Sequence, residues 1–156
     1  MQKYLDQIDG VMETEAGFAN GTTLKPTYQQ VCKDNTGHAE TVRVVYNEDK
    51  LPLEKLLKLY FESIDPTAVN RQGGDQGVQY RTGIYYVEEE QKAVIRQQLA
   101  ELQKSYAEPV AVECLPLDNF YAAEEYHQKY LEKNPEGYSH LTTEMFDRAY
   151  EESRKN

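Results

Sequence analysis

Residues 39–64, AETVRVVYNEDKLPLEKLLKLYFESI, contain the two patterns that decide the fold class. From Ala39 to Tyr46 the side chains alternate with a period of two, which predicts a β-strand. From Pro52 to Ile64 the apolar side chains form one continuous helical stripe, and proline suits the first turn of a helix. The stretch therefore predicts a strand followed closely by an amphipathic helix, which is the repeating unit of an α/β protein.

The rest of the chain adds helices and strands on both sides of this unit. A first helix ends at Gly10, because glycine commonly stops a helix. The other predicted elements are a strand at Val11–Phe18, a helical turn at Thr27–Cys32, a strand at Arg81–Val87, a helix at Glu88–Tyr106, a strand at Val110–Leu117, a helix at Tyr121–Lys133 and a charged helix near Thr142–Ser153. This order predicts a single domain over residues 1–156, an α/β (α+β) two-layer sandwich with a mixed sheet.

Composition narrows the function classes. The 156 residues carry a formal net charge of −10, so phosphate backbones and anionic lipid repel the chain, and neither nucleic acid nor membrane is expected as a partner. No apolar run has the length needed to cross a membrane, and the polar start MQKYLDQIDG is not a secretory signal. Two cysteines do not make a disulfide framework, so we expect a cytoplasmic protein.

Three polar clusters are candidates for chemistry. Glu40 begins an apolar strand, where desolvation raises a carboxyl pKa and makes a proton donor; the alternative is a solvated Glu40 or one paired with Arg43. The glycine-rich residues 71–81 let backbone approach a ligand, or form a surface loop; they match neither a P-loop nor a dinucleotide fingerprint. Tyr130 and Tyr138 flank a turn and can share one pocket, or Tyr130 simply packs on a helix face.

Two rival sites are weaker. His38, Glu40, Asp75 and His127 are possible zinc ligands, but their spacing matches no short metal motif, so no metal is expected. Cys32 or Cys114 as a nucleophile is the other rival. Cys114 lies in a strand with a core-like pattern, where a thiol stays protonated, and Cys32 has no evident histidine partner other than His38.

Taken together, the clusters resemble the A-type peptide methionine sulfoxide reductases. The resemblance covers nearly all of the chain up to Tyr138, in family order and spacing. The matching strings are GFANG (17–21), PTY (26–28), VC (31–32), TGHAE (36–40), GDQGVQYR (74–81), HQKYL (127–131) and NPEGY (134–138). Each string alone is weak evidence of relationship, but the ordered set is specific.

The resemblance implies an α/β sandwich with a ferredoxin-like core and reduction of the S-epimer of methionine sulfoxide, free or in proteins. By resemblance, Glu40 protonates the sulfoxide oxygen, Tyr28 and Tyr80 hydrogen-bond it, and Asp75 orders the site. The same resemblance places Tyr130, Tyr138 and His38 in the substrate-binding pocket. It implies no cofactor, and thioredoxin or another thiol as external reductant.

The chain also departs from the family. The family nucleophile lies in a Gly-Cys-Phe-Trp-Gly string, and Met1 aligns just after it, so we expect the family's first strand and its nucleophile to be missing from these residues. Residues 1–156 alone are therefore predicted to be inactive, and the alternative is a non-catalytic relative that binds methionine or its sulfoxide. Ser139 occupies the common position of a resolving cysteine, and residues 139–156 form a predicted tail with a helix.

Overall fold

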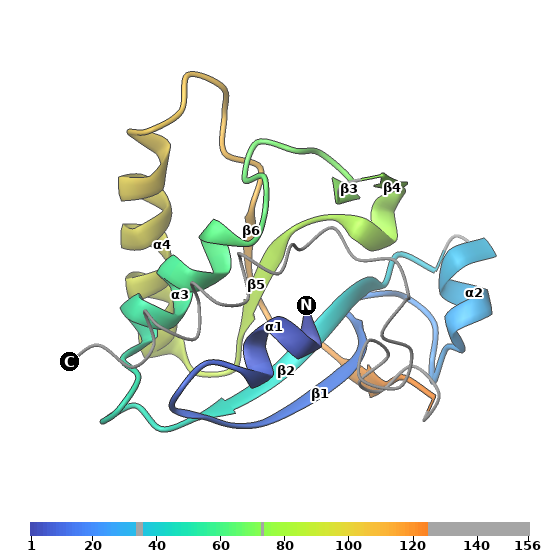
Figure 1. The fold of residues 1–156 in the computed structure, drawn as a ribbon. Coiled ribbons are helices and arrows are strands. Elements are labelled where there is room, and N and C mark those ends of the chain that lie inside the picture. The colour runs from blue at the N-terminus through green and yellow to red at the C-terminus, as the bar shows by residue number, and fades with distance from the viewer. Residues whose placement is uncertain (34–35, 73, 125–156) are drawn as a thin grey trace.

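A computed structural model describes residues 1–33, 36–72 and 74–124 (Figure 1). Its elements in chain order are α1 (Gln2–Asp6), β1 (Val11–Ala19), α2 (Tyr28–Lys33), β2 (Ala39–Tyr46), α3 (Leu53–Glu62), β3 (Arg71–Gln72), β4 (Asp75–Gln76), the 3₁₀-helix η1 (Val78–Tyr80), β5 (Gly83–Tyr86), α4 (Glu89–Gln103), β6 (Glu113–Pro116) and β7 (Phe120–Ala122). The predicted α+β class is confirmed. The helices predicted at 121–133 and 142–153 lie almost wholly outside the described residues.

The strands form three separate sheets among the described residues. The order β2-β1-β7 is antiparallel throughout, β3 and β4 form a short hairpin, and β5 pairs with β6 in parallel. The sequence predicts a helix from Tyr121, but Phe120–Ala122 instead pairs with Gly17–Ala19 of β1. That correction has a tertiary cause, because strand pairing overrides a weak local helix preference.

Helix α3 ties the two larger sheets together. Its Leu56 and Leu59 pack with Tyr4, Leu5, Ile8 and Leu51 in one core cluster, against partly buried side chains of β1 and β2. Its Leu57 and Phe61 pack with Tyr86, Ile95 and Val112 in a second cluster, between β5 and α4. A single apolar stripe on α3 therefore serves two cores, and Figure 1 shows α3 beside α4.

Glycine is required at two turns of this framework. Gly10, with φ of +104°, ends the α1–β1 turn, and a Cβ there would lie 2.6 Å from the Cβ of Leu51. Gly21 follows β1, and a Cβ there would lie 2.2 Å from the His38 ring. These close contacts exclude a larger side chain at both positions.

An unfilled space separates β2 from β5. The Ala123 N–H donates to the Ala16 carbonyl, so the main-chain groups of Ala16 point towards β7. The main-chain groups of the next residue, Gly17, point the other way, towards its β2 partner Thr41. By the same alternation, Glu40, Val42 and Val44 point their main-chain groups away from β1.

The facing edge of β5 is open too. The Glu113 and Leu117 N–H groups donate to the carbonyls of Thr82 and Tyr86, so Gly83 and Tyr85 turn their main-chain groups away from β6. Among the described residues no strand pairs with either edge. None of the described helices is long and apolar enough to cross a membrane.

Candidate active site

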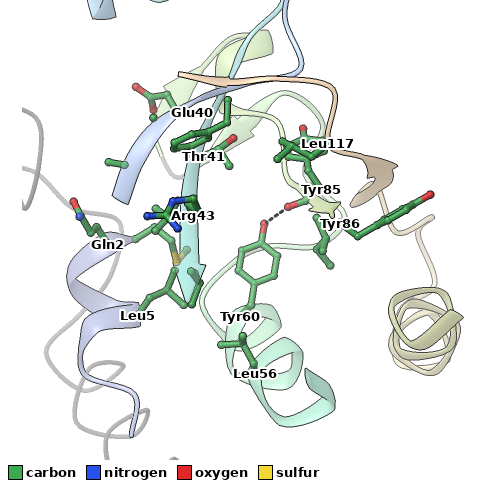
Figure 2. A pocket seen from close by; sticks show the side chains of 18 of the residues that line it. Gln2, Leu5, Glu40, Thr41, Arg43, Leu56, Tyr60, Tyr85, Tyr86 and Leu117 are labelled. Carbon is green, nitrogen blue, oxygen red and sulfur yellow. Dashed lines mark hydrogen bonds between the residues drawn. The ribbon is translucent and has the colours of Figure 1, made fainter. Parts of the chain in front are cut away.

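The site is a groove of about 740 Å³ between β2 and β5. Met1, Leu5 of α1 and Leu56 of α3 contribute apolar side chains to its walls. Figure 2 shows Glu40 at the upper end of the groove and Tyr60 of α3 at the lower end, reaching towards β5. The groove therefore has Glu40 at one end and apolar side chains along much of its walls, with other charged residues such as Glu48 and Glu88 also lining it.

Three predicted site residues come together on this groove: Tyr28, Glu40 and Asp75 all line it. They come from α2, β2 and β4, which are far apart in the chain. Tyr80 ends η1, next to Arg81, which lines the groove, but Tyr80 itself is not among the lining residues. Tyr130, Tyr138, His127 and Ser139 lie outside the described residues.

Glu40 has the electrostatics of a proton donor. It is the second residue of β2 and pairs with Phe18 of β1, whose ring is buried and shares its face of the sheet. Burial raises the pKa of Glu40, the negative charge of Asp75 adds to that effect and the positive N-terminus opposes it, so that the pKa lies at about 7. The Glu40 carboxyl therefore carries a proton for a large part of the time at neutral pH.

This pKa makes stability depend on pH. Because the folded state holds the Glu40 proton more tightly than the unfolded chain, stability falls as pH rises from about 4.5 to about 7. The free energy of unfolding falls by roughly 3 kcal/mol in total, because each unit of pKa difference between the folded and unfolded chain is worth about 1.36 kcal/mol.

We expect Glu40→Gln to remove that loss, because its amide has the same shape and no charge. Urea unfolding at pH 5 and pH 8 measures the effect, with exposed Glu13→Gln on β1 as the control. If the native protein and Glu40→Gln lose the same free energy of unfolding between the two pH values, Glu40 ionises as it does in water.

Asp75 lies in the β3–β4 hairpin. Gln72 pairs with Asp75, and the Gly77 N–H donates to the Asn70 carbonyl at 2.8 Å, which closes the hairpin. The long glycine-rich segment is thus a short hairpin followed by η1. Its fold carries the Asp75 charge to the Glu40 end of the groove.

His38 does not line the groove. Its side chain is 1% exposed, its Nδ1 accepts the Gly21 N–H at 3.1 Å, and its Nε2 lies 2.8 Å from the Thr23 carbonyl. A neutral ring protonated at Nε2 satisfies both contacts. The ring also meets Tyr121 edge-on, at a centroid distance of 5.8 Å. In this arrangement His38 holds the loop after β1 against the end of β7.

Asn20 explains another part of the GFANG string. Its φ of +55° turns the chain at the end of β1. Its Oδ1 accepts the Asp118 N–H at 2.8 Å, and its Nδ2 donates to the Pro116 carbonyl at 3.1 Å. The side chain therefore fastens the β6–β7 loop to β1, which is a structural role.

Tyr60 of α3, Tyr85 of β5 and the ion pair between Arg81 and Glu113 of β6 form a polar group around β5 that the sequence does not predict. The Tyr60 hydroxyl donates to the Gly83 carbonyl at 3.4 Å, and burial raises the Tyr60 pKa to about 12. Burial also raises the pKa of Tyr85, whose hydroxyl donates to Glu113 Oε2 at 3.1 Å, while Arg81 Nε lies 3.0 Å from Glu113 Oε1. Both hydroxyls stay protonated at neutral pH. The sequence signal for them is the high tyrosine content, with 13 tyrosines in the chain.

The rival sites receive no support from the described residues. No group of three or more His, Cys, Asp or Glu side chains in that part of the chain is arranged to hold a metal ion. Cys114 is a half-buried free thiol on β6 and is not among the groove's lining residues.

Comparison with known proteins identifies the family. A family model described as peptide methionine sulfoxide reductase matches residues 1–156. The chain therefore belongs to the peptide methionine sulfoxide reductase family, and its similarity to curated A-type enzymes places it with that type.

One such relative is peptide methionine sulfoxide reductase MsrA of Lachnoclostridium phytofermentans, with 59% identity over 148 residues, 95% of this chain and 89% of the relative. Reduced Mxr1 of Saccharomyces cerevisiae superposes with a TM-score of 0.82 at 37% identity, covering 88% of this chain and 78% of that one. Mxr1 in complex with Trx2 superposes with a TM-score of 0.55 at 25% identity, covering 80% of this chain and 69% of that one.

Proposed function

We propose that this site reduces the S-epimer of methionine sulfoxide, free or in proteins, to methionine at the expense of a thiol. The observation that carries the proposal is the Glu40 carboxyl, with its pKa of about 7, on a groove that Tyr28 and Asp75 also line. A sulfoxide sulfur is a poor electrophile until its oxygen is protonated or strongly hydrogen-bonded. A neutral carboxyl on the same groove as a tyrosine supplies that activation without a metal or other cofactor.

Each residue has a proposed role. Glu40 gives its proton to the sulfoxide oxygen, and the Tyr28 and Tyr80 hydroxyls donate hydrogen bonds to it. Asp75 keeps Glu40 protonated through its negative charge, as its effect on the Glu40 pKa supports. Tyr130, Tyr138 and His38 are proposed for substrate binding. His38 contributes by holding the loop around Gly21, because its ring contacts that backbone.

The redox step balances with thiols alone. A thiolate attacks the sulfur of the protonated sulfoxide and forms a sulfur–sulfur bond. The oxygen then leaves the methionine sulfur as hydroxide and adds to the attacking sulfur while the sulfur–sulfur bond breaks, so methionine is reduced by two electrons and the attacking sulfur is oxidised by two to a sulfenic acid. A second thiol condenses with the sulfenic acid, forming a disulfide and water. A thioredoxin-type dithiol then reduces the disulfide, which the yeast Mxr1–Trx2 complex supports for this family. Ser139 in place of a resolving cysteine makes an external thiol more important, and a reducing cytoplasm supplies one.

The proposed reaction also needs a nucleophilic cysteine. Residues 1–156 contain Cys32 and Cys114 but no Gly-Cys-Phe-Trp-Gly string. Met1 lines the groove, so a segment joined ahead of it would deliver a cysteine beside Glu40. We infer that residues 1–156 alone do not turn over. The second candidate is a non-catalytic module that binds methionine or its sulfoxide in the same groove.

Reduction of dabsylated methionine sulfoxide tests the proposal, with dithiothreitol as donor and each epimer assayed separately. Residues 1–156 and the same chain preceded by Gly-Cys-Phe-Trp-Gly, the extended chain, are compared. We expect turnover of the S-epimer by the extended chain only, unchanged by Cys32→Ser. If residues 1–156 reduce the sulfoxide and Cys32→Ser abolishes that activity, Cys32 is the nucleophile. An inactive extended chain that still binds the sulfoxide would favour the binding module.

A further inference from the structure

Helix α2 brings Tyr28 to the groove from the edge of the molecule, where Figure 1 shows it. Its first turn is closed locally by a reciprocal pair: the Gln30 N–H donates to Thr27 Oγ1 at 3.2 Å, and the Thr27 N–H donates to Gln30 Oε1 at 2.9 Å. This capping box sets where the helix begins. It cannot set where the helix lies relative to the sheets, because Gln30 is in α2 and Thr27 directly precedes it.

A carboxylate from the other end of the described chain makes the long-range connection. The Tyr28 N–H donates to both carboxyl oxygens of Glu124, at 3.0 Å to Oε1 and 3.3 Å to Oε2. The two residues are 96 positions apart. An N–H in the first turn of a helix has no partner within the helix, and a carboxylate is the acceptor that the helix dipole favours there.

The backbone that carries Glu124 is itself anchored on the sheet. Ala122 pairs with Gly17 of β1, and the Ala123 N–H donates to the Ala16 carbonyl at 2.9 Å. Glu124 therefore extends from the end of a paired strand rather than from a free loop. The contact transmits the position of the β1–β7 ladder to the backbone of the residue whose side chain lines the groove.

We propose that Glu124 is a positioning residue that holds Tyr28 at the groove. It acts on the main chain of Tyr28 and does not itself touch the reacting atoms. The inference rests on the proposed function for its effect on the reaction rate. The hydrogen bonds from the Tyr28 N–H to Glu124, called the clamp below, belong to the described residues and are measurable without turnover. A hydroxyl aimed at a sulfoxide oxygen is useful only in a fixed geometry, and small displacements of such groups lower rates steeply.

The first measurement is made on residues 1–156 by ¹⁵N NMR. Glu124→Ala removes both acceptor oxygens, whereas Glu124→Gln keeps one and removes the charge. We expect the Tyr28 amide proton to move upfield and lose protection from hydrogen exchange in Glu124→Ala, with Glu124→Gln intermediate. Glu108→Ala, an exposed glutamate after α4, is the matched control and leaves the Tyr28 amide unchanged. An unaltered Tyr28 amide in Glu124→Ala overturns the proposal.

The second measurement is a double-mutant cycle in the extended chain. We expect Glu124→Ala to lower kcat by about 10-fold, with partial rescue by Glu124→Gln, and to have no further effect in a Tyr28→Phe background. An equal loss in both backgrounds shows that Glu124 acts elsewhere and overturns the proposal. If no variant of the extended chain reduces sulfoxide, the proposed function fails, and the Tyr28 amide still decides the clamp.

Discussion

An extended apolar segment of five or six residues, joined ahead of Gly-Cys-Phe-Trp-Gly in the extended chain, is expected to raise the melting temperature by about 10 °C. The reason is the space between β2 and β5. Val42 and Val44 on one side, and Gly83 and Tyr85 on the other, direct main-chain groups towards it. A strand laid along the apolar walls of the groove would hydrogen-bond to both edges, replacing the Tyr60 contact with the Gly83 carbonyl, and would leave the Glu40 end for substrate.

The size of the effect follows from burial. Apolar surface contributes about 25 cal/mol per Å² removed from water, so a strand buried against the groove's apolar walls stabilises the fold by several kcal/mol. For a chain of this length each kcal/mol is worth about 2–4 °C in melting temperature. Typical domains have a free energy of unfolding of only about 5–15 kcal/mol, so the stabilisation from the added strand is a large fraction of that total.

Circular dichroism melts of the extended chain with and without the apolar segment measure the shift, after sedimentation has shown that both are monomers. The control carries the same added residues with proline at alternate positions, because proline cannot complete a ladder. Equal melting temperatures for all three chains would show that the space between β2 and β5 does not receive a strand. Self-association of residues 1–156 that disappears in the strand-bearing chain would support pairing at these edges.

Glu40→Gln is expected to lower the rate of S-sulfoxide reduction by the extended chain by about 10²-fold or more, the usual scale for a general acid. The amide keeps the shape of the side chain and cannot give up a proton to the sulfoxide oxygen. The loss appears in kcat, because the proton is needed in the transition state and not for binding.

The pH profile gives an independent reading of the same residue. With the pKa of Glu40 at about 7, the fraction that carries a proton falls above neutral pH, so the rate through the acid falls there too. Glu40→Gln should lack that limb of the profile, while Glu13→Gln on the exposed side of β1 keeps it. A Glu40→Gln variant with the native rate and profile would remove Glu40 from the reaction.

Local patterns in the amino-acid sequence determine much of the framework. The strand at Ala39–Tyr46 has the predicted bounds, and α3 and α4 fall within the predicted helices, because period-two and helical periodicity are properties of neighbouring residues. The family is also identifiable from the sequence, since strings such as TGHAE and GDQGVQYR occur in order along the chain. Glu40 is a candidate for the same reason, as its place at the start of an apolar strand is visible in the sequence.

Only the tertiary structure decided how these parts meet. Burial and the charge of Asp75 raise the pKa of Glu40, and the Tyr28 N–H donates to Glu124, which is 96 positions away, so neither interaction can be found from residues nearby in the chain. Pairing with β1 likewise turned the predicted helix start at Tyr121 into a strand. Desolvation, charge and strand pairing act across space, whereas periodicity records only which face of an element is apolar. The sequence therefore specified the elements and the candidate acid, and the packing of α3 between two sheets specified the groove on which they act.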